Sequence, residues 1–315
     1  MRTILLVLGV LIAAILGAVW YFSIPDIPRA VLEAKYATPP SQFLTLADGT
    51  RAHVRDRGPR AAPALVLIHG SNASLFTWEP WASRLDGTFR IVSMDLPAHG
   101  LTGATPSGDY SGAGMVKFVK AVTDKLGLEK FAIAGNSMGG GVAARFAETY
   151  PNEVSALILV DAAGMPQKSG PPLLFRMLGT PVINKVFEHV TPRSLVVQLL
   201  NQAVVRKLII TNAMIDQYWE FARMTGTRQA TNARFSLPPD PYVYEHVADI
   251  KAPTLVLWGE EDHLIPIASG RAWAKAIPGA KLITYAGTGH IPQEEVPDRS
   301  AEDVKAFLLA RWPQN

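Results

Sequence analysis

The stretch Phe131-Ala-Ile-Ala-Gly-Asn-Ser-Met-Gly-Gly-Gly141 is the part of the chain around which the rest is organised. Its first four residues form a short apolar run, which is typical of a buried parallel strand. Residues 142–149 then favour a helix that ends before Pro151. Between the two, Gly135-Asn-Ser-Met-Gly139 fits the pattern G-x-S-x-G, in which a tight turn exposes a serine hydroxyl at the edge of a sheet. The stretch therefore predicts a strand, a turn that presents Ser137, and a helix.

The turn also has a predicted electrostatic role. Because Met138 begins the helix, its backbone N–H is unpaired within the helix and lies at the positive end of the helix dipole, which favours an anion. A short pattern of this kind also occurs where glycines serve only close packing, so the remaining sequence must decide between the two interpretations.

Composition indicates a globular protein and excludes several kinds of site. A composition of 48% hydrophobic and 18% charged residues is typical of a globular core. The length of 315 residues suits one large domain or two small ones. The net charge of +3 comes without a basic run, so we expect no nucleic-acid partner. The absence of cysteine excludes disulfides, thiolate zinc sites and cysteine nucleophiles. The sequence contains no metal-binding cluster, Walker lysine or G-x-G-x-x-G, so we expect neither a metal nor a cofactor.

The N-terminal residues 1–25 are predicted to be a membrane anchor. Residues 3–22 carry no charge, and about 20 helical residues span the ~30 Å hydrocarbon core of a bilayer. Trp20 and Tyr21 lie where aromatic residues meet the membrane interface. A cleaved signal peptide and a buried core helix are the alternatives, but the apolar run is long and lacks a small-x-small cleavage site.

The charges that flank this segment give the orientation. Arg2 and the α-amine favour a cytoplasmic N-terminus, although Arg29 and Lys35 lie on the other flank. We therefore expect a single-pass membrane protein whose soluble domain is on the non-cytoplasmic side, in the periplasm if the source is bacterial.

The remaining chain alternates apolar runs with amphipathic segments. Residues 26–42 are rich in proline and are predicted to be a linker, and 43–57 form a hairpin about Asp48-Gly49. Six further runs are predicted strands: 64–68, 90–94, 131–134, 156–160, 254–258 and 281–285. Helices are predicted at 73–85, 112–126, 142–149, 268–276 and 298–311. This alternation predicts an α/β fold with a doubly wound, mostly parallel sheet, formed by residues 43–164 and 250–315.

Residues 165–249 interrupt the alternation. They contain helix-like blocks divided by prolines, and 194–210 are nearly all aliphatic. Because ligands bind at the carboxyl edge of open α/β sheets, we expect this insertion to be a helical cap over that edge.

Two further strand ends carry the partners that a serine nucleophile requires. A hydroxyl must lose its proton to a base, and the base needs an acid that holds its tautomer. Asp262 follows the 254–258 strand, and His290 follows the 281–285 strand on a glycine-rich loop. Ser71, after the 64–68 strand, would bring its backbone N–H close to that of Met138, and two such donors would stabilise a tetrahedral oxyanion.

These motifs together resemble the α/β-hydrolase family, and the resemblance extends from Phe43 to Trp312. The motifs that carry it are His69-Gly70, Asp95-Leu-Pro-Ala-His-Gly100, Gly135-Asn-Ser-Met-Gly139, Gly259-Glu-Glu-Asp262 with Pro266, and Gly289-His290. Ala98 departs from the glycine that is more usual there. The resemblance implies Ser137 as nucleophile, His290 as base, Asp262 as acid, and Ser71 and Met138 as oxyanion donors. The anchored and capped architecture is also similar to that of membrane-bound monoacylglycerol lipases.

Other polar residues receive structural interpretations. Asp161 ends the 156–160 strand and is the alternative triad acid, since some relatives place the acid there. His69 and His99 are expected to order loops, and His53 is expected at the surface or in a satisfied position. Phe76, Trp78 and Trp81 are expected to contribute to packing.

The sequence thus predicts a hydrolase that cleaves a small-molecule carboxylic ester through an acyl-enzyme. Lactonase, C–C hydrolase and cofactor-free peroxidase activities of the same fold are alternatives, as is a non-catalytic binding module of another class. The aliphatic cap residues favour an apolar acyl substrate such as a lipid ester; they are Leu173, Leu174, Phe175, Met177, Leu178, Leu195, Val196, Val197, Leu199 and Leu200. The alternative is that these side chains only pack the cap onto the sheet.

Overall fold

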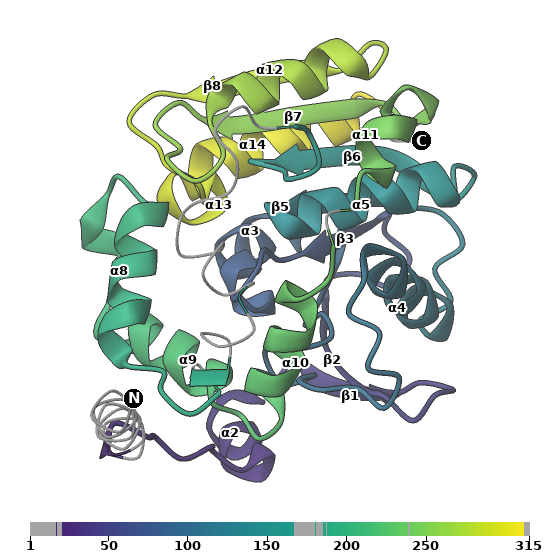
Figure 1. Cartoon of the computed structure of the whole chain (residues 1–315). Coiled ribbons are helices and arrows are strands. Elements are labelled where there is room, and N and C mark those ends of the chain that lie inside the picture. The colour runs from purple at the N-terminus through teal and green to yellow at the C-terminus, as the bar shows by residue number, and fades with distance from the viewer. Residues whose placement is uncertain are drawn as a thin grey trace.

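The computed structural model describes residues 17, 21–166, 180, 185, 186, 188–238 and 240–311. An eight-stranded sheet runs through the centre, in the order β1-β2-β4-β3-β5-β6-β7-β8 (Figure 1). Its strands are β1 Ser41–Thr45, β2 Arg51–Arg57, β3 Ala64–Ile68, β4 Arg90–Met94, β5 Phe131–Asn136, β6 Val154–Val160, β7 Thr254–Gly259 and β8 Lys281–Tyr285. The pairings from β4 through β8 are parallel, and those of β1 with β2 and β2 with β4 are antiparallel. The predicted mostly parallel α/β sheet is confirmed.

The predicted hairpin is β1 and β2. Gly49 takes the positive φ of 82° that the turn requires, and the Thr50 N–H donates to the Asp48 carboxylate at 2.9 Å. Strand β3, by contrast, is buried along its whole length, which explains its continuous apolar sequence.

Helices cover both faces of the sheet (Figure 1). One apolar layer joins the sheet to α4 Gly112–Lys125, α5 Met138–Thr149 and α12 Ile267–Ala276. The other joins it to η1 Leu75–Trp78, α3 Glu79–Leu85 and α14 Pro297–Leu309. Trp78 and Trp81 are fully buried in this second layer, as predicted for packing residues.

The described part of 165–249 is mostly helical. In Figure 1 its helices 193–203, 212–222 and 227–235 lie beside one edge of the sheet, whereas 242–246 lies beside α5. Its elements are α8 Arg193–Ala203, η2 Lys207–Ile209, α9 Asn212–Ala222, α10 Thr227–Phe235, α11 Tyr242–His246 and η3 Val247–Asp249. The short helix α13 Pro292–Glu295 follows β8. The predicted cap residues Leu173, Leu174, Phe175, Met177 and Leu178 lie outside the described residues.

Residues 26–42 differ from the expected linker. They contain the helix α2 Arg29–Tyr36, whose Leu32 is buried in an apolar cluster with Phe221 and Met224 of the cap region. The Arg29 guanidinium donates to the carbonyl of Leu101 at 2.5 Å. Tertiary contacts thus hold this segment against the rest of the domain, although its prolines suggested a linker.

Most of the predicted anchor, residues 1–25, lies outside the described residues. Within the part of the chain that the structure describes, no helix combines the length and the apolar character needed to cross a bilayer.

Candidate active site

Ser137 lies at the junction of β5 and α5 in a strained conformation, with φ 54° and ψ −123°. The flanking glycines are required by close backbone contacts. A Cβ on Gly135 would lie 2.1 Å from the Gly139 carbonyl oxygen, and one on Gly139 would lie 2.3 Å from that of Ile68. The sequence therefore forms the predicted sharp turn because only glycine fits on either side of the serine.

Asp262 and His290 form a buried hydrogen bond, 2.7 Å from Oδ2 to Nδ1. The side chain of Asp262 is fully buried. Its other oxygen, Oδ1, accepts the backbone N–H groups of Leu264 at 2.7 Å and Ile265 at 3.0 Å. These donors stabilise an ionised carboxylate and fix its orientation, which leaves Oδ2 to hold the imidazole in one tautomer.

The loop that carries His290 is tied directly to the serine turn. Asn136, next to Ser137, donates through Nδ2 to the His290 carbonyl at 2.9 Å and to that of Val160 at 3.1 Å. The His290 N–H donates to the carbonyl of Ala203 in the cap at 2.7 Å. Ser137 and His290 are thus joined through one intervening side chain.

Glu295 also supports this loop. Its Oε1 accepts the Gly289 N–H at 2.7 Å, and its Oε2 accepts the N–H groups of Val205 and Arg206 at 2.9 Å. One buried carboxylate therefore links the histidine loop to the cap. The sequence analysis did not single out Asn136 or Glu295. Asn136 could have been recognised from its place inside the turn motif, whereas Glu295 belongs to no motif.

Asp161 lies beside the pair but does not replace Asp262. It is fully buried, and its Oδ1 accepts the Gly259 N–H at 3.0 Å. Burial, and then the neighbouring Asp262, raise the pKa of Asp161 well above its usual range. Asp161, Asp262 and His290 have the residue types of a metal site, with one atom of each within 4.8 Å of the others. A metal ion would need the lone pairs of His290 Nδ1 and Asp262 Oδ2, but these two atoms already share a hydrogen bond. This trio is therefore better suited to proton transfer than to binding a cation.

The loop that contains Ser71 lies against the serine turn. A Cβ on Gly70 would lie only 3.1 Å from Cβ of Ser137. His69 orders this loop, since its Nε2 accepts the Leu96 N–H at 3.0 Å and its Nδ1 bonds the Gly70 carbonyl at 2.7 Å. The ring of His99 bonds the Pro97 carbonyl at 2.8 Å. The predicted loop-ordering roles of both histidines are confirmed.

His53 is buried and satisfied, as one of the predicted interpretations held. Its Nδ1 bonds the Asp95 carboxylate at 2.6 Å and its Nε2 bonds the Ser41 hydroxyl at 2.9 Å. The same carboxylate accepts the N–H groups of Leu75 and Leu101, each at 2.7 Å. Asp95 and His53 therefore hold the loops around the candidate site in place.

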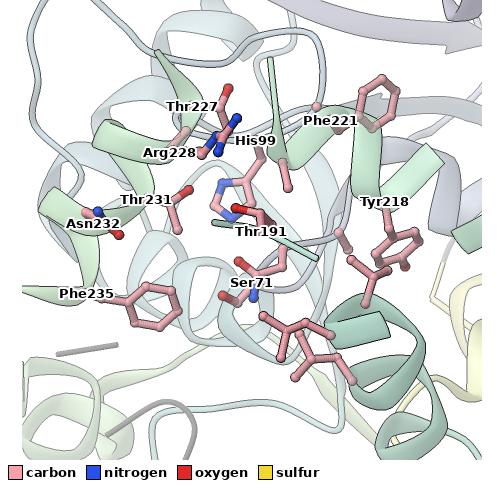
Figure 2. Close-up of a pocket in the computed structure, with 18 of the residues that line it drawn as sticks. Ser71, His99, Thr191, Tyr218, Phe221, Thr227, Arg228, Thr231, Asn232 and Phe235 are labelled. Atoms are coloured by element: carbon pink, nitrogen blue, oxygen red, sulfur yellow. The ribbon is translucent and has the colours of Figure 1, made fainter. Parts of the chain in front are cut away.

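An apolar cavity of about 180 Å³ opens beside Ser71 (Figure 2). Its walls combine the Ser71 loop, the loop at His99, and cap side chains. Those from the cap include Leu195, Val196, Leu199, Leu200, Tyr218, Phe221 and Phe235. Leu195, Val196, Leu199 and Leu200 of α8 thus line a cavity, whereas Val197 packs within the cap and Phe76 is not part of this lining.

Arg234, in the last turn of α10, touches both predicted oxyanion residues. Its Nη2 donates to the Ser71 hydroxyl at 2.7 Å, and its Nη1 contacts the Met138 sulfur at 3.4 Å. Burial lowers the pKa of Arg234 to about 10, so the guanidinium still carries its charge at neutral pH. The sequence analysis did not single out this arginine, because no motif accompanies it.

Comparisons with known proteins find several hydrolases to which the chain is similar. The chain is similar to lipase 1 of Psychrobacter immobilis, with 28% identity over 84% of this chain and 82% of the lipase. It is also similar to a 2-hydroxy-6-oxononadienedioate/2-hydroxy-6-oxononatrienedioate hydrolase of Comamonas testosteroni, with 26% identity over 82% and 92% of the two chains. A solved structure described as a membrane phospholipase A, a bacterial virulence factor, has a TM-score of 0.75 at 26% identity and covers both chains fully.

A family model also matches the chain. The profile described as the alpha/beta hydrolase fold matches residues 63–297, which include the serine turn, the cap and the Asp262–His290 pair. This range covers well over half of the chain. The protein is therefore a member of the α/β-hydrolase family of enzymes.

Proposed function

We propose that the protein is a serine hydrolase that cleaves carboxylic esters of apolar acyl groups through an acyl-enzyme. The observation that carries this proposal is the buried Asp262–His290 pair, fixed through Asn136 to the strained turn at Ser137. A nucleophile, a base and an orienting acid are the groups that acyl transfer requires.

The proposed roles follow from the geometry. His290 takes the hydroxyl proton as Ser137 attacks the acyl carbon, and Asp262 stabilises the imidazolium that forms. The backbone N–H groups of Ser71 and Met138 bind the oxyanion of the tetrahedral intermediate. His290 then returns its proton to the leaving alcohol, and a water activated by the same histidine releases the acid.

The preference for an apolar acyl group rests on the cavity beside Ser71. Aliphatic and aromatic cap residues form much of its wall, and each buried methylene contributes about 0.8 kcal/mol. A cavity of about 180 Å³ has room for an acyl chain of several carbon atoms. The similarity to a lipase and to a membrane phospholipase A supports a lipid-derived ester.

Covalent labelling tests the nucleophile. A fluorophosphonate should label the wild type, and Ser137→Ala should lose both labelling and the hydrolysis of p-nitrophenyl hexanoate. Ser83→Ala, at an exposed serine of α3, is the matched control and should keep both labelling and hydrolysis. Labelling that persists in Ser137→Ala would reject the assignment, and a wild type that binds ligand without being labelled would support a non-catalytic module.

Hydrolysis of a carbon–carbon bond is the second candidate, because the similarity to the Comamonas enzyme covers 92% of that protein. Comparing p-nitrophenyl hexanoate with a 2-hydroxy-6-oxo-dienoate in one assay separates the two. A value of kcat/KM that is higher for the dienoate would reject the esterase proposal.

We also propose that residues 1–25 hold the enzyme in a membrane as a single-pass anchor, with the catalytic domain on the non-cytoplasmic side. The similarity to a membrane phospholipase A supports this proposal. The full-length protein should remain in the membrane fraction after a carbonate wash. Deletion of residues 1–21 should release an active enzyme, because the contacts of Ile24 and Ile27 with the cap region are retained. A wild-type chain that the wash releases would contradict the anchor.

A further inference from the structure

The Arg234 side chain lies between two cavities. Ser71, which accepts its Nη2–H, lines the apolar cavity of about 180 Å³. Met138, which its Nη1 contacts, lines a second cavity of about 610 Å³, and Arg234 itself lines that cavity. The guanidinium therefore joins a wall residue of the first cavity to a wall residue of the second.

Among the described residues, Arg234 has no carboxylate partner. Every aspartate and glutamate of the sequence falls within the described ranges, and none of them forms an ion pair with Arg234. Asp240, which lines the same second cavity, is paired with Arg145. The Nε of Arg234 is also buried without a hydrogen-bond partner. Arg234 as a whole is half-buried, and a half-buried cation without a counter-charge would be stabilised by a bound anion.

We propose that Arg234 binds an anionic oxygen group, a carboxylate or a phosphate, carried on the alcohol side of the ester. The apolar cavity beside Ser71 suits the acyl chain, and the cavity beside Met138 and Arg234 then receives the alcohol portion with its charge. The planar guanidinium offers parallel N–H donors that match the oxygens of either group. This inference rests on the proposed ester hydrolysis and specifies its substrate class.

The contact with Ser71 helps to place this charge. Because the Ser71 hydroxyl accepts from Arg234, its own hydrogen is available for donation to the same ligand. The anion would thus be held by the guanidinium and by a neutral hydroxyl, close to the carbonyl that Ser137 attacks.

Matched substrates test the inference. Hexanoyl glycolate carries a carboxylate near the ester oxygen, and hexanoyl glycolamide is its neutral counterpart. We expect the wild type to favour the glycolate at least tenfold in kcat/KM, and the ratio to fall to about one in Arg234→Gln. Arg234→Lys should keep part of the preference, because it retains the charge without the planar fork. A second pair, 2-(hexanoyloxy)ethyl phosphate and 2-hydroxyethyl hexanoate, shows whether a phosphate or a carboxylate is preferred.

Arg193→Gln is the control for long-range charge. This substitution removes one positive charge from the cap at a residue that lines neither cavity and is paired with Asp216. The preference for anionic substrates should remain. Equal rates on charged and neutral substrates in the wild type, or a preference that persists in Arg234→Gln, would overturn the inference.

A binding measurement separates this inference from the proposed function. Hexyl phosphate should bind full-length Ser137→Ala at least tenfold more tightly than it binds Ser137→Ala/Arg234→Gln, whereas 1-hexanol should bind both alike. Isothermal titration calorimetry measures both affinities. Failure to hydrolyse any ester would reject the proposed function, yet tighter binding of hexyl phosphate by Ser137→Ala would still support an anion site at Arg234. Equal binding of hexyl phosphate by the two variants would reject the anion site, even in an active esterase.

Discussion

Asp161 directly follows β6, and Asp262 follows the neighbouring strand β7. One carboxylate oxygen of Asp161 lies within 4.8 Å of one carboxylate oxygen of Asp262. Only Asp262 hydrogen-bonds to His290, at 2.7 Å. Burial and the charge of Asp262 raise the pKa of Asp161 well above its usual range, which favours the protonated form of Asp161. A neutral acid can lie beside an ionised one without like-charge repulsion, so the two aspartates are not equivalent.

Substitution of the two acids by asparagine should separate their contributions. Asp262→Asn should reduce kcat by about 10⁴-fold, the loss that follows when the acid of a comparable triad is changed to asparagine. Asp161→Asn should cost less than about tenfold, because an amide resembles a protonated carboxyl in shape and charge. Steady-state kinetics at pH 7.5 measure both effects. The reverse ranking would place the functional acid after β6.

The cavity beside Ser71 predicts the acyl-chain preference. Within a p-nitrophenyl ester series, kcat/KM should rise from acetate to hexanoate, because each added methylene is buried. Leu199→Trp should move the optimum to shorter chains, since Leu199 lines this cavity.

Gln198→Trp adds the same bulk at the exposed neighbouring position of α8 and should leave the optimum unchanged. A maximum at acetate in the wild type would mean that the cavity does not bind the acyl chain.

Glu294 should make stability depend on pH. Burial, followed by the nearby Glu295, raises its pKa to about 7, although a bond from the Thr77 hydroxyl opposes the shift. A carboxyl with a raised pKa favours the protonated form in the folded state. Its ionisation therefore lowers stability progressively as pH rises from about 4.5 to 7.

Glu294→Gln should consequently match the wild type near pH 4 and be more stable above pH 7, by about 1–2 kcal/mol after allowance for partial exposure. Urea unfolding at both pH values measures the difference. Glu302→Gln, at an exposed residue of α14, should show no such change with pH. A stability difference that is constant between the two pH values would contradict the assignment.

The pair of Asp26 and Arg228 should stabilise the cap. The Arg228 guanidinium is only 4% exposed and donates to Asp26 at 2.9 Å. Asp26→Asn leaves this buried cation without its counter-charge and should cost about 1–3 kcal/mol of unfolding free energy. Asp298→Asn breaks the exposed pair with Arg84 and should cost less than about 1 kcal/mol. Similar losses of unfolding free energy in the two variants would show that the Asp26 pair stabilises the protein no more than an exposed ion pair does.

The sheet could be predicted because its strands are buried on both faces. Continuous apolar runs such as Ala64–Ile68 have no other stable position in a fold of this kind, and the structure places a strand there with the same bounds. The helix Arg29–Tyr36 was not predicted, because Pro28 and the other prolines indicate a linker. This helix is stabilised by distant partners, such as the carbonyls of Leu101 and Thr102 that accept from Arg29.

In the candidate site, too, the residues at strand ends could be predicted from local sequence, whereas those placed by distant contacts could not. Ser137, Asp262 and His290 follow strand ends, so a parallel sheet places them at one edge, and the structure gives the expected bond between the last two. Arg234 and Glu295 reach this edge through long-range packing of the cap and of α13. Contacts of this type depend on how the insertion folds back over the sheet, and no local spacing in the sequence encodes them.

The attachment of the N-terminal segment has a mechanical consequence. Ile27 pairs with Met224, its N–H donates to the Arg223 carbonyl at 2.7 Å, and Asp26 binds Arg228. A mechanical force along residues 24–27 would act first on the loop between α9 and α10, and only afterwards on the central strands. Since Phe221 and Arg228 on these helices also line the apolar cavity, a force applied to the N-terminal segment would act on the walls of that cavity.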